Sequence, residues 1–161
     1  MTGRPASHSI QGTTLVVAAK RSCAPQWRAF MEALAASLST VAGDELALRI
    51  LAGVGASLAK QQPLPTCGSL TDLKTAMNAA LDELDWGQID VYEAERALEL
   101  VVIGYPYFEG VEAQTAFAAV LEALLEGWLT AQGTRPGLAM RLVERGSGAY
   151  PPLVFRYERI S

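Results

Sequence analysis

The sequence is poor in the residue types on which most enzymatic reactions depend. Its 161 residues include a single histidine, His8, and two cysteines, Cys23 and Cys67. A histidine-based catalytic triad needs an imidazole held by the fold, whereas His8 lies in a polar N-terminal segment. A zinc site needs about four ligands, and two cysteines do not make a disulfide framework. We therefore interpret both cysteines as reduced thiols, and we expect no catalytic residues, no metal site and no cofactor.

Charge and long apolar runs are also scarce. Charged residues make up 19% of the chain, and the net charge is −4. Nucleic-acid binding needs a basic face, so this composition excludes nucleic acid as a partner. No run approaches the roughly 18 continuous apolar residues of a membrane span. The chain is therefore expected to be neither a nucleic-acid-binding protein nor a membrane-spanning one.

The N-terminal segment contains one stretch that loosely resembles an export signal. Arg4 precedes the apolar run 13–19, but Lys20 and Arg21 stand where small residues should lead to a cleavage site. The β-branched residues of this run favour a short strand instead. We expect residues 1–24 to form a flexible N-terminal arm, and the protein to be cytoplasmic.

The chain is rich in apolar residues, which make up 50% of it. Since charges are few, part of this apolar surface is expected to be buried against other copies, and we predict a homo-oligomer. There is no internal repeat and no linker wide enough to separate two domains. Residues 25–161 are therefore expected to form a single domain.

Apolar side chains recur at helical spacing in three segments between residues 25 and 85. The first begins near Pro25, a favourable first-turn residue. Its apolar stripe consists of Trp27, Phe30, Met31, Leu34, Leu38 and Val41. The third begins at Ser69, which forms a capping-box pattern with Asp72. Three N-terminal helices are therefore predicted.

The second of these helices contains two glycines, Gly53 and Gly55. Its large apolar residues are Leu46, Ile50, Val54 and Leu58. A glycine in mid-helix costs about 1 kcal/mol relative to alanine, so a compensating contact is expected. We predict a tightly packed helix or intersubunit contact at Gly53 and Gly55.

After Trp86 the period of apolar residues changes from 3.6 to 2. Residues 89–92 alternate as a strand with one buried face, and 98–104 are apolar on both faces, which is typical of a central strand. A helix over 112–132, with Trp128 on its inner face, precedes two further strands. This order predicts an α+β fold: three helices, then β-β-α-β-β, with helices packed on a four-stranded, mainly antiparallel sheet.

Two groups of side chains are candidate sites. Glu93 and Glu95 have the spacing of a glycosidase carboxylate pair, but nothing nearby would raise the pKa of one partner, so we interpret them as solvated. Aromatic faces bind sugars well, and the tyrosines in or beside the strands are the better candidates. They are Tyr92, Tyr105, Tyr107 and Tyr150. The alternative for each of them is packing in the core or at an interface.

Several segments, taken as an ordered set, resemble the D-subunit family of bacterial cellulose synthase. They are the helix 49–55, the proline-flanked Cys67 in the loop 63–67, the helix 73–84 that closes on Trp86-Gly87, and the Leu-rich helix 121–130 with its Glu-Gly-x-Trp. The likeness extends over about residues 27–156. A weaker, fold-level likeness connects the same α+β order with small-molecule-binding domains of the V4R and TRAPP type.

The resemblance implies a non-catalytic component near the inner membrane, with the periplasmic side as the alternative location. It implies a ring-shaped octamer built from dimers, with internal passages for β-1,4-glucan chains, and a role in ordered, crystalline cellulose. It also implies two partners, the membrane-embedded cellulose synthase complex and a proline-rich scaffold protein. In this scheme the four tyrosines are candidate glucan contacts, and Gly53, Gly55 and Trp128 are candidate packing residues.

Overall fold

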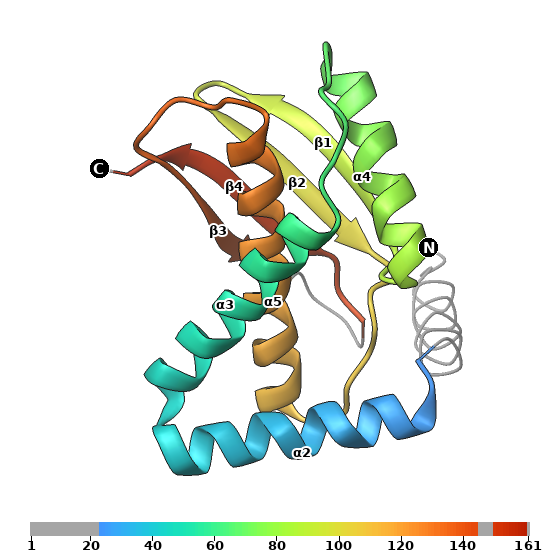
Figure 1. The fold of residues 1–161 in the computed structure, drawn as a ribbon, viewed down its shortest axis with the longest axis vertical. Coiled ribbons are helices and arrows are strands. Elements are labelled where there is room, and N and C mark those ends of the chain that lie inside the picture. The colour runs from blue at the N-terminus through green and yellow to red at the C-terminus, as the bar shows by residue number, and fades with distance from the viewer. Residues whose placement is uncertain (1–22, 145–149, 161) are drawn as a thin grey trace, which may run out of the picture.

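The computed structural model describes residues 23–144 and 150–160. Within them, four helices and four strands form the predicted α+β arrangement (Figure 1). The elements are α2 (Pro25–Ala42), α3 (Asp44–Gln61), α4 (Leu70–Leu84), β1 (Gln88–Ala94), β2 (Ala97–Ile103), α5 (Val111–Ala131), β3 (Leu138–Glu144) and β4 (Leu153–Arg159). The predicted arm 1–24 lies almost wholly outside the described residues, and the short strand expected at 13–19 lies wholly outside them.

The four strands form one antiparallel sheet in the order β1-β2-β4-β3. A two-residue turn, Glu95-Arg96, joins β1 to β2, so Ala94 pairs directly with Ala97. The strand β2 lies between β1 and β4, as its apolar faces predicted. The sheet therefore has β1 and β3 as its two edges.

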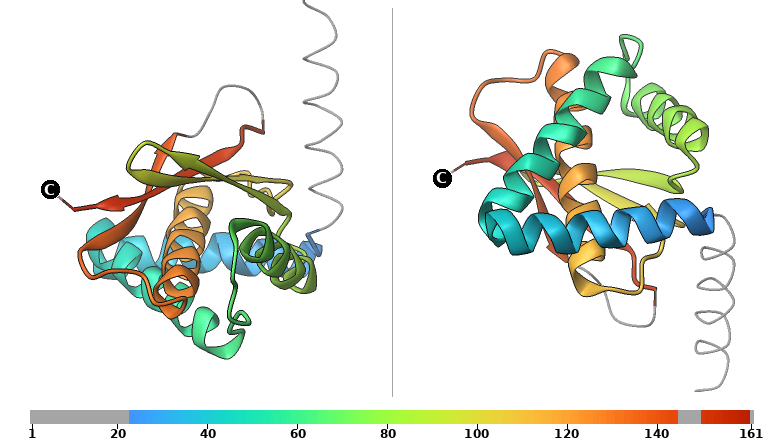
Figure 2. Two further views of the ribbon diagram at one scale, coloured as in Figure 1. Left: turned by 90° about the horizontal axis from the view of Figure 1, so that it is seen from above. Right: turned by 60° about the horizontal axis from the view of Figure 1, so that its bottom comes forward.

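The helices cover one face of this sheet in two layers. Helix α5 packs against β3 and β4, and α3 packs along the opposite side of α5. Helix α4 lies beside β1, and α2 crosses the ends of α3 and α5 (Figure 2). The other face of the sheet is not covered by any described element, so its side chains face outward.

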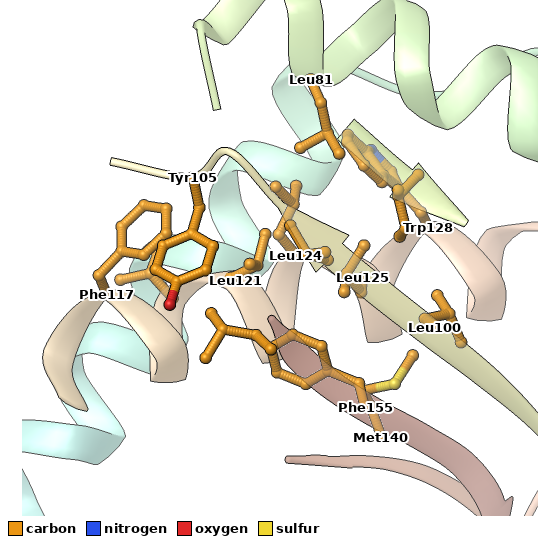
Figure 3. Packing of buried hydrophobic residues seen from close by; sticks show 14 of the residues in the cluster. Leu81, Leu100, Tyr105, Phe117, Leu121, Leu124, Leu125, Trp128, Met140 and Phe155 are labelled. Carbon is orange, nitrogen blue, oxygen red and sulfur yellow. The ribbon is translucent and has the colours of Figure 1, made fainter. Parts of the chain in front are cut away.

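The core lies between α5 and the sheet. Leu121, Leu124, Leu125 and Trp128 of α5 are fully buried and point toward the strands and toward α4 (Figure 3). They meet the equally buried Phe155 of β4 together with residues of β2 and β3. Because α5 lies between the sheet and α3, it is buried on more than one side. This explains why its apolar residues extend beyond a single stripe.

The predicted cap of α4 is confirmed. The Ser69 hydroxyl accepts a hydrogen bond from the Asp72 amide at 3.1 Å, which satisfies one of the free donors of the first turn. At the other end Asp85 adopts a left-handed conformation, and Gly87 follows with φ +89°. A Cβ on Gly87 would overlap the Ile103 carbonyl oxygen. Glycine is therefore required where α4 turns into β1 beside the end of β2.

Candidate functional site

The structure separates the four candidate tyrosines into two places. Tyr105, Tyr107 and Tyr150 form one aromatic cluster, with ring centroids 4.7 Å apart for Tyr105–Tyr150 and 5.6 Å apart for Tyr107–Tyr150. Tyr92 lies on the uncovered face of the sheet, in β1. The four tyrosines therefore do not form one continuous row.

The three members of the tyrosine cluster differ in how open they are. Tyr105 is only 3% exposed, and its hydroxyl donates to the Pro151 carbonyl at 2.6 Å, which joins β2 to the start of β4. Tyr150 is half-buried, its hydroxyl has no hydrogen-bond partner among the described residues, and burial raises its pKa far above the usual range. A hollow of about 230 Å³ lies beside Tyr105 and Tyr107. Tyr105 therefore packs in the core, and of these two tyrosines Tyr107 is the one that a ligand in the hollow could contact.

Tyr92 is 51% exposed and borders a larger groove of about 720 Å³ between α4 and the β1–β2 hairpin. Lys74 of α4 forms an ion pair with Asp90, and Tyr92 lies two residues after Asp90 on the same face of β1. The Lys74 ammonium holds the pKa of Asp90 below its usual value, and the Asp90 carboxylate raises the pKa of Tyr92. The three side chains therefore lie together along the groove as one polar group.

The two glycines of α3 have different surroundings. A Cβ on Gly55 would overlap the Val120 carbonyl oxygen and lie 2.9 Å from the Ala123 Cβ, so α3 and α5 are in backbone contact there. At Gly53 no atom of the described residues lies within 4 Å of such a Cβ. The close contact predicted for the pair is thus present within the chain only at Gly55, and Gly53 faces open space.

Trp128 also lies inside the fold. It is fully buried, and its indole N–H donates to the Gln62 carbonyl at the end of α3 over 2.8 Å. It therefore joins α5 to α3 and to the loop that follows.

The outward side of α2 and α3 is an apolar surface, which we call the α2–α3 face. Its large residues are between 42% and 87% exposed. They are Trp27, Phe30, Val41, Leu46, Ile50 and Val54. Of the four large apolar residues expected on the second helix, Leu58 is partly buried against the core, and Leu46, Ile50 and Val54 are exposed. The residues that α3 buries fully are Ala47, Leu51, Gly55 and Ala59. The large residues are therefore left for another contact.

An apolar crevice of about 380 Å³ opens beside this face. It lies between α2, α3 and the segment 106–108, and Trp27, Phe30, Val54, Trp86 and Phe117 are among its lining residues. The rings of Trp27 and Phe30 stack at 5.6 Å at its rim. The crevice and the α2–α3 face thus share residues and form one apolar region.

Side chains hydrogen-bond some of the outward-pointing backbone groups at each edge of the sheet. At β3, the amides of Met140 and Leu142 donate to the carboxylates of Glu126 and Glu122 on α5, at 2.8 and 2.6 Å. At β1, the Asn78 side chain of α4 bonds both the N–H and the C=O of Ile89 at 2.9 Å. Free strand edges invite pairing with other chains. These contacts oppose extension of the sheet.

Burial raises the pKa of Glu122, and the nearby Glu126 adds to this, whereas the Leu142 hydrogen bond and Arg141 act against it. A carboxyl group with a raised folded pKa stabilises the fold below its unfolded pKa, and this stability is lost as the pH rises through the folded pKa. Glu122→Gln keeps an acceptor for Leu142 without a charge. It is expected to be more stable than wild type at about pH 7, by an amount that vanishes near the unfolded pKa, at about pH 4.

Urea denaturation at the two pH values measures this difference. Glu122→Ala is the matched control, because it removes the acceptor as well as the charge and is expected to cost about 1 kcal/mol at neutral pH. A Gln variant less stable than wild type at neutral pH would show that the charge of Glu122 is needed at the sheet edge.

The two acidic residues near the β1–β2 turn are both exposed. Glu93 lies near the end of β1, in alternation with Tyr92, and Glu95 lies in the turn itself. Within residues 23–144 and 150–160, no group of three or more histidine, cysteine, aspartate or glutamate side chains could hold a metal ion. None of the described helices is both long and apolar enough to cross a membrane.

Together these features define a class: an α+β protein whose edge strands are hydrogen-bonded in part by helix side chains and whose helices expose an apolar face. The sequence model of the family described as the D subunit of cellulose synthase matches residues 13–157. The chain therefore belongs to the cellulose synthase D-subunit family, as the ordered set of segments predicted.

Curated relatives agree with this family. The chain is 31% identical over 112 residues to a cellulose synthase operon protein D of Komagataeibacter xylinus, and the match covers 67% of this chain and 72% of the relative. The same identity and coverage relate it to a protein of that description from Komagataeibacter sucrofermentans. The family is that of an accessory component of the cellulose synthase operon.

Sequence reasoning missed the carboxylates that hydrogen-bond the β3 edge. A signal for them exists: Glu122 and Glu126 stand four residues apart on one side of an otherwise apolar helix. Such a pair at a half-buried position needs hydrogen-bond donors, and a neighbouring strand edge supplies them. The role of Asn78 leaves no comparable signal, because it depends on how α4 lies against β1.

Proposed function

We propose that this chain is a non-catalytic, oligomeric component of the cellulose synthesis and secretion machinery. It guides β-1,4-glucan chains and promotes ordered, crystalline cellulose. The assembly is a homo-octameric ring built from dimers, and it works beside the membrane-embedded cellulose synthase complex. Its place is the cytoplasmic side of the inner membrane, with the periplasmic side as the alternative, and a proline-rich scaffold protein is a further partner.

The α2–α3 face is the observation that carries this proposal. Soluble proteins rarely leave large apolar patches uncovered, and such a patch marks an interaction surface. Phe30 of α2 and Ile50 of α3 are half-exposed, and Gly53, three residues after Ile50 on the same helix, offers room for close approach of a second helix. Since side chains hydrogen-bond part of each sheet edge, we expect copies of the chain to meet through these helices.

The test is the mass of the purified protein in solution. Ile50→Glu places a charge in the proposed contact and is expected to weaken association by about 30-fold or more, the effect of losing a central interface residue. Light scattering at micromolar concentration should show a multimer for wild type and species nearer the 17.2 kDa monomer for the variant.

Val143→Glu is the matched control, because Val143 is 49% exposed and lies in β3, which does not contact α2 or α3. It is expected to keep the wild-type mass. A monomeric wild type, or an Ile50→Glu protein of unchanged mass, would remove the basis for the ring.

A ligand-binding function of the V4R type is the second candidate, and the apolar crevice favours it. Its lining is entirely apolar, and it lies under α2 and α3, where such a domain would hold a small apolar molecule. Native mass spectrometry distinguishes the two functions. A copurifying apolar ligand on a monomer supports the sensory domain, whereas a ligand-free multimer supports the scaffold.

A further inference from the structure

The groove between α4 and the β1–β2 hairpin has the composition of a sugar-binding surface. Its floor includes the side chains of Val101 and Ile103, which face outward from β2. Polar side chains from α4 and β1 stand around this floor. They are Lys74, Asp82, Gln88 and Asp90. The half-exposed ring of Tyr92 completes the groove at the β1 side.

Register explains how this surface arises. Gln88, Asp90 and Tyr92 alternate with the inward-facing Ile89 and Val91, so all three point to the uncovered face. Across the hairpin, Asp90 pairs with Val101 and Gln88 pairs with Ile103. Each of these two outward polar side chains of β1 therefore has an apolar neighbour on β2, and polar and apolar groups lie in parallel rows.

We propose that this groove is a binding site for one face of a β-1,4-linked glucan, on the outside of the folded chain. The polymer is a flat ribbon whose ring faces carry C–H groups and whose edges carry hydroxyls. An apolar floor with an aromatic ring suits the faces, and polar rows beside it suit the hydroxyls. This inference rests on the proposed function, because it assigns a site for the same polymer.

One pair of polar groups in the groove has partners before a ligand arrives. The Asp90 carboxylate forms an ion pair with the Lys74 ammonium, which restricts how these two side chains orient. Groups that are already restricted lose less conformational entropy on binding. Lys74 is the one cation among the described residues that line the groove, and its ion pair offsets its charge. A neutral polyhydroxylated ligand fits these properties.

The position of the groove matters for assembly. The groove lies between α4 and the β1–β2 hairpin, at the β1 edge of the sheet. Helices α2 and α3 lie on the helical side of the sheet (Figure 2). Copies that meet through α2 and α3 therefore leave the groove accessible. Glucan contact in the groove and contact between copies use separate surfaces and are separable by mutation.

The experiment uses the full-length chain and cellohexaose as the probe, with binding followed by saturation-transfer NMR. Maltohexaose, which is α-1,4-linked and curled, is the control that tests whether binding requires the flat shape of a β-1,4-linked chain. Tyr92→Ala is expected to weaken cellohexaose binding about fivefold or more, because it removes the aromatic platform. Tyr92→Phe keeps the ring and is expected to change affinity by less than about twofold.

Tyr107→Ala is the matched control in the tyrosine cluster and should leave binding close to wild type. The site is refuted if the wild type fails to bind cellohexaose at millimolar concentration, if it binds maltohexaose equally well, or if Tyr107→Ala rather than Tyr92→Ala abolishes binding. Light scattering on the same samples keeps the two ideas apart. If the protein is a multimer and Tyr92→Ala does not change cellohexaose binding, only the groove proposal is refuted. If the protein is a monomer, only the ring proposal is refuted.

Discussion

Gly55→Ala is expected to destabilise the fold by about 2 to 3 kcal/mol, although alanine is the better helix former. Gly53→Ala, two residues earlier in the same helix, is expected to stabilise it by about 1 kcal/mol, which is the difference in helix propensity. One helix thus contains a matched pair of identical substitutions with opposite expected signs.

The reason for the loss at Gly55 is the crossing of α3 and α5. A methyl group there would overlap the Val120 carbonyl oxygen and approach the Leu124 amide nitrogen to 3.0 Å. Backbone atoms do not move aside as a flexible side chain does, so the helices must separate. The same crossing brings Gly127 of α5 close to Ala59 of α3, since a Cβ on Gly127 would lie 2.6 Å from the Ala59 Cβ.

Urea denaturation of the two variants, with the mass of each checked by light scattering, measures these changes. The slope of unfolding free energy against urea should stay constant, because the surface exposed on unfolding is nearly unchanged. Equal stabilities for Gly55→Ala and wild type would mean that α3 and α5 cross with more room than the structure has. A loss of mass in Gly53→Ala at unchanged stability would place Gly53 in the contact between copies.

The order of helices and strands was predictable because the period of apolar residues changes to 2 after Trp86, returns to 3.6 in α5 and changes to 2 again in β3 and β4. The inner face of α5 was predictable too, since its long apolar residues are buried as a set. The large apolar residues of α3, by contrast, did not predict which side of this helix is buried. Large apolar residues normally mark the buried stripe, but here the buried stripe consists mostly of small residues between Ala47 and Ala59, because α5 approaches so closely.

The small-residue crossing leaves a pattern in the sequence that period alone does not reveal. Gly55 and Ala59 stand four residues apart on α3, and Ala123 and Gly127 stand four apart on α5. Residues at this spacing share one helix face. Two such pairs, in helices separated by α4 and the β1–β2 hairpin, become meaningful only when the fold brings them together. The pattern therefore indicates a close contact but not its partner.

The types of residue that form the candidate surfaces could be predicted from the sequence, but their positions in the fold could not. Tyr92, predicted within a strand, and Tyr105, predicted just after one, were equal candidates in the sequence, yet one is half-exposed on the sheet and the other is buried, with its hydroxyl bonded to Pro151. The exposure of Tyr92 follows from the alternation of side chains along β1. The burial of Tyr105 depends on β4, which returns to pair with β2. A residue whose neighbour comes from a distant segment cannot be assigned to core or surface from local period alone.

Trp128→Ala is expected to cost about 3 to 5 kcal/mol, the range for removing a fully buried large aromatic side chain. Trp128 has no exposed surface, and its indole N–H reaches the Gln62 carbonyl just beyond the end of α3. One turn later on α5, the Gln132 side chain bonds the Cys67 amide at 2.9 Å and the Pro65 carbonyl at 3.1 Å. The end of α5 therefore holds the whole connection from α3 to α4.

Trp128→Phe separates the hydrogen bond from the volume. The substitution keeps most of the aromatic volume, but it removes the hydrogen-bond donor of the Gln62 carbonyl and creates a small void. We expect it to lower the free energy of unfolding by about 2 kcal/mol. Gln132→Ala is the comparison, since it removes two hydrogen bonds to the same loop from a more exposed position and is expected to cost about 1 kcal/mol. Urea denaturation gives the three values. If Trp128→Phe matches wild type, the indole hydrogen bond contributes nothing, and packing alone joins α5 to the α3–α4 connection.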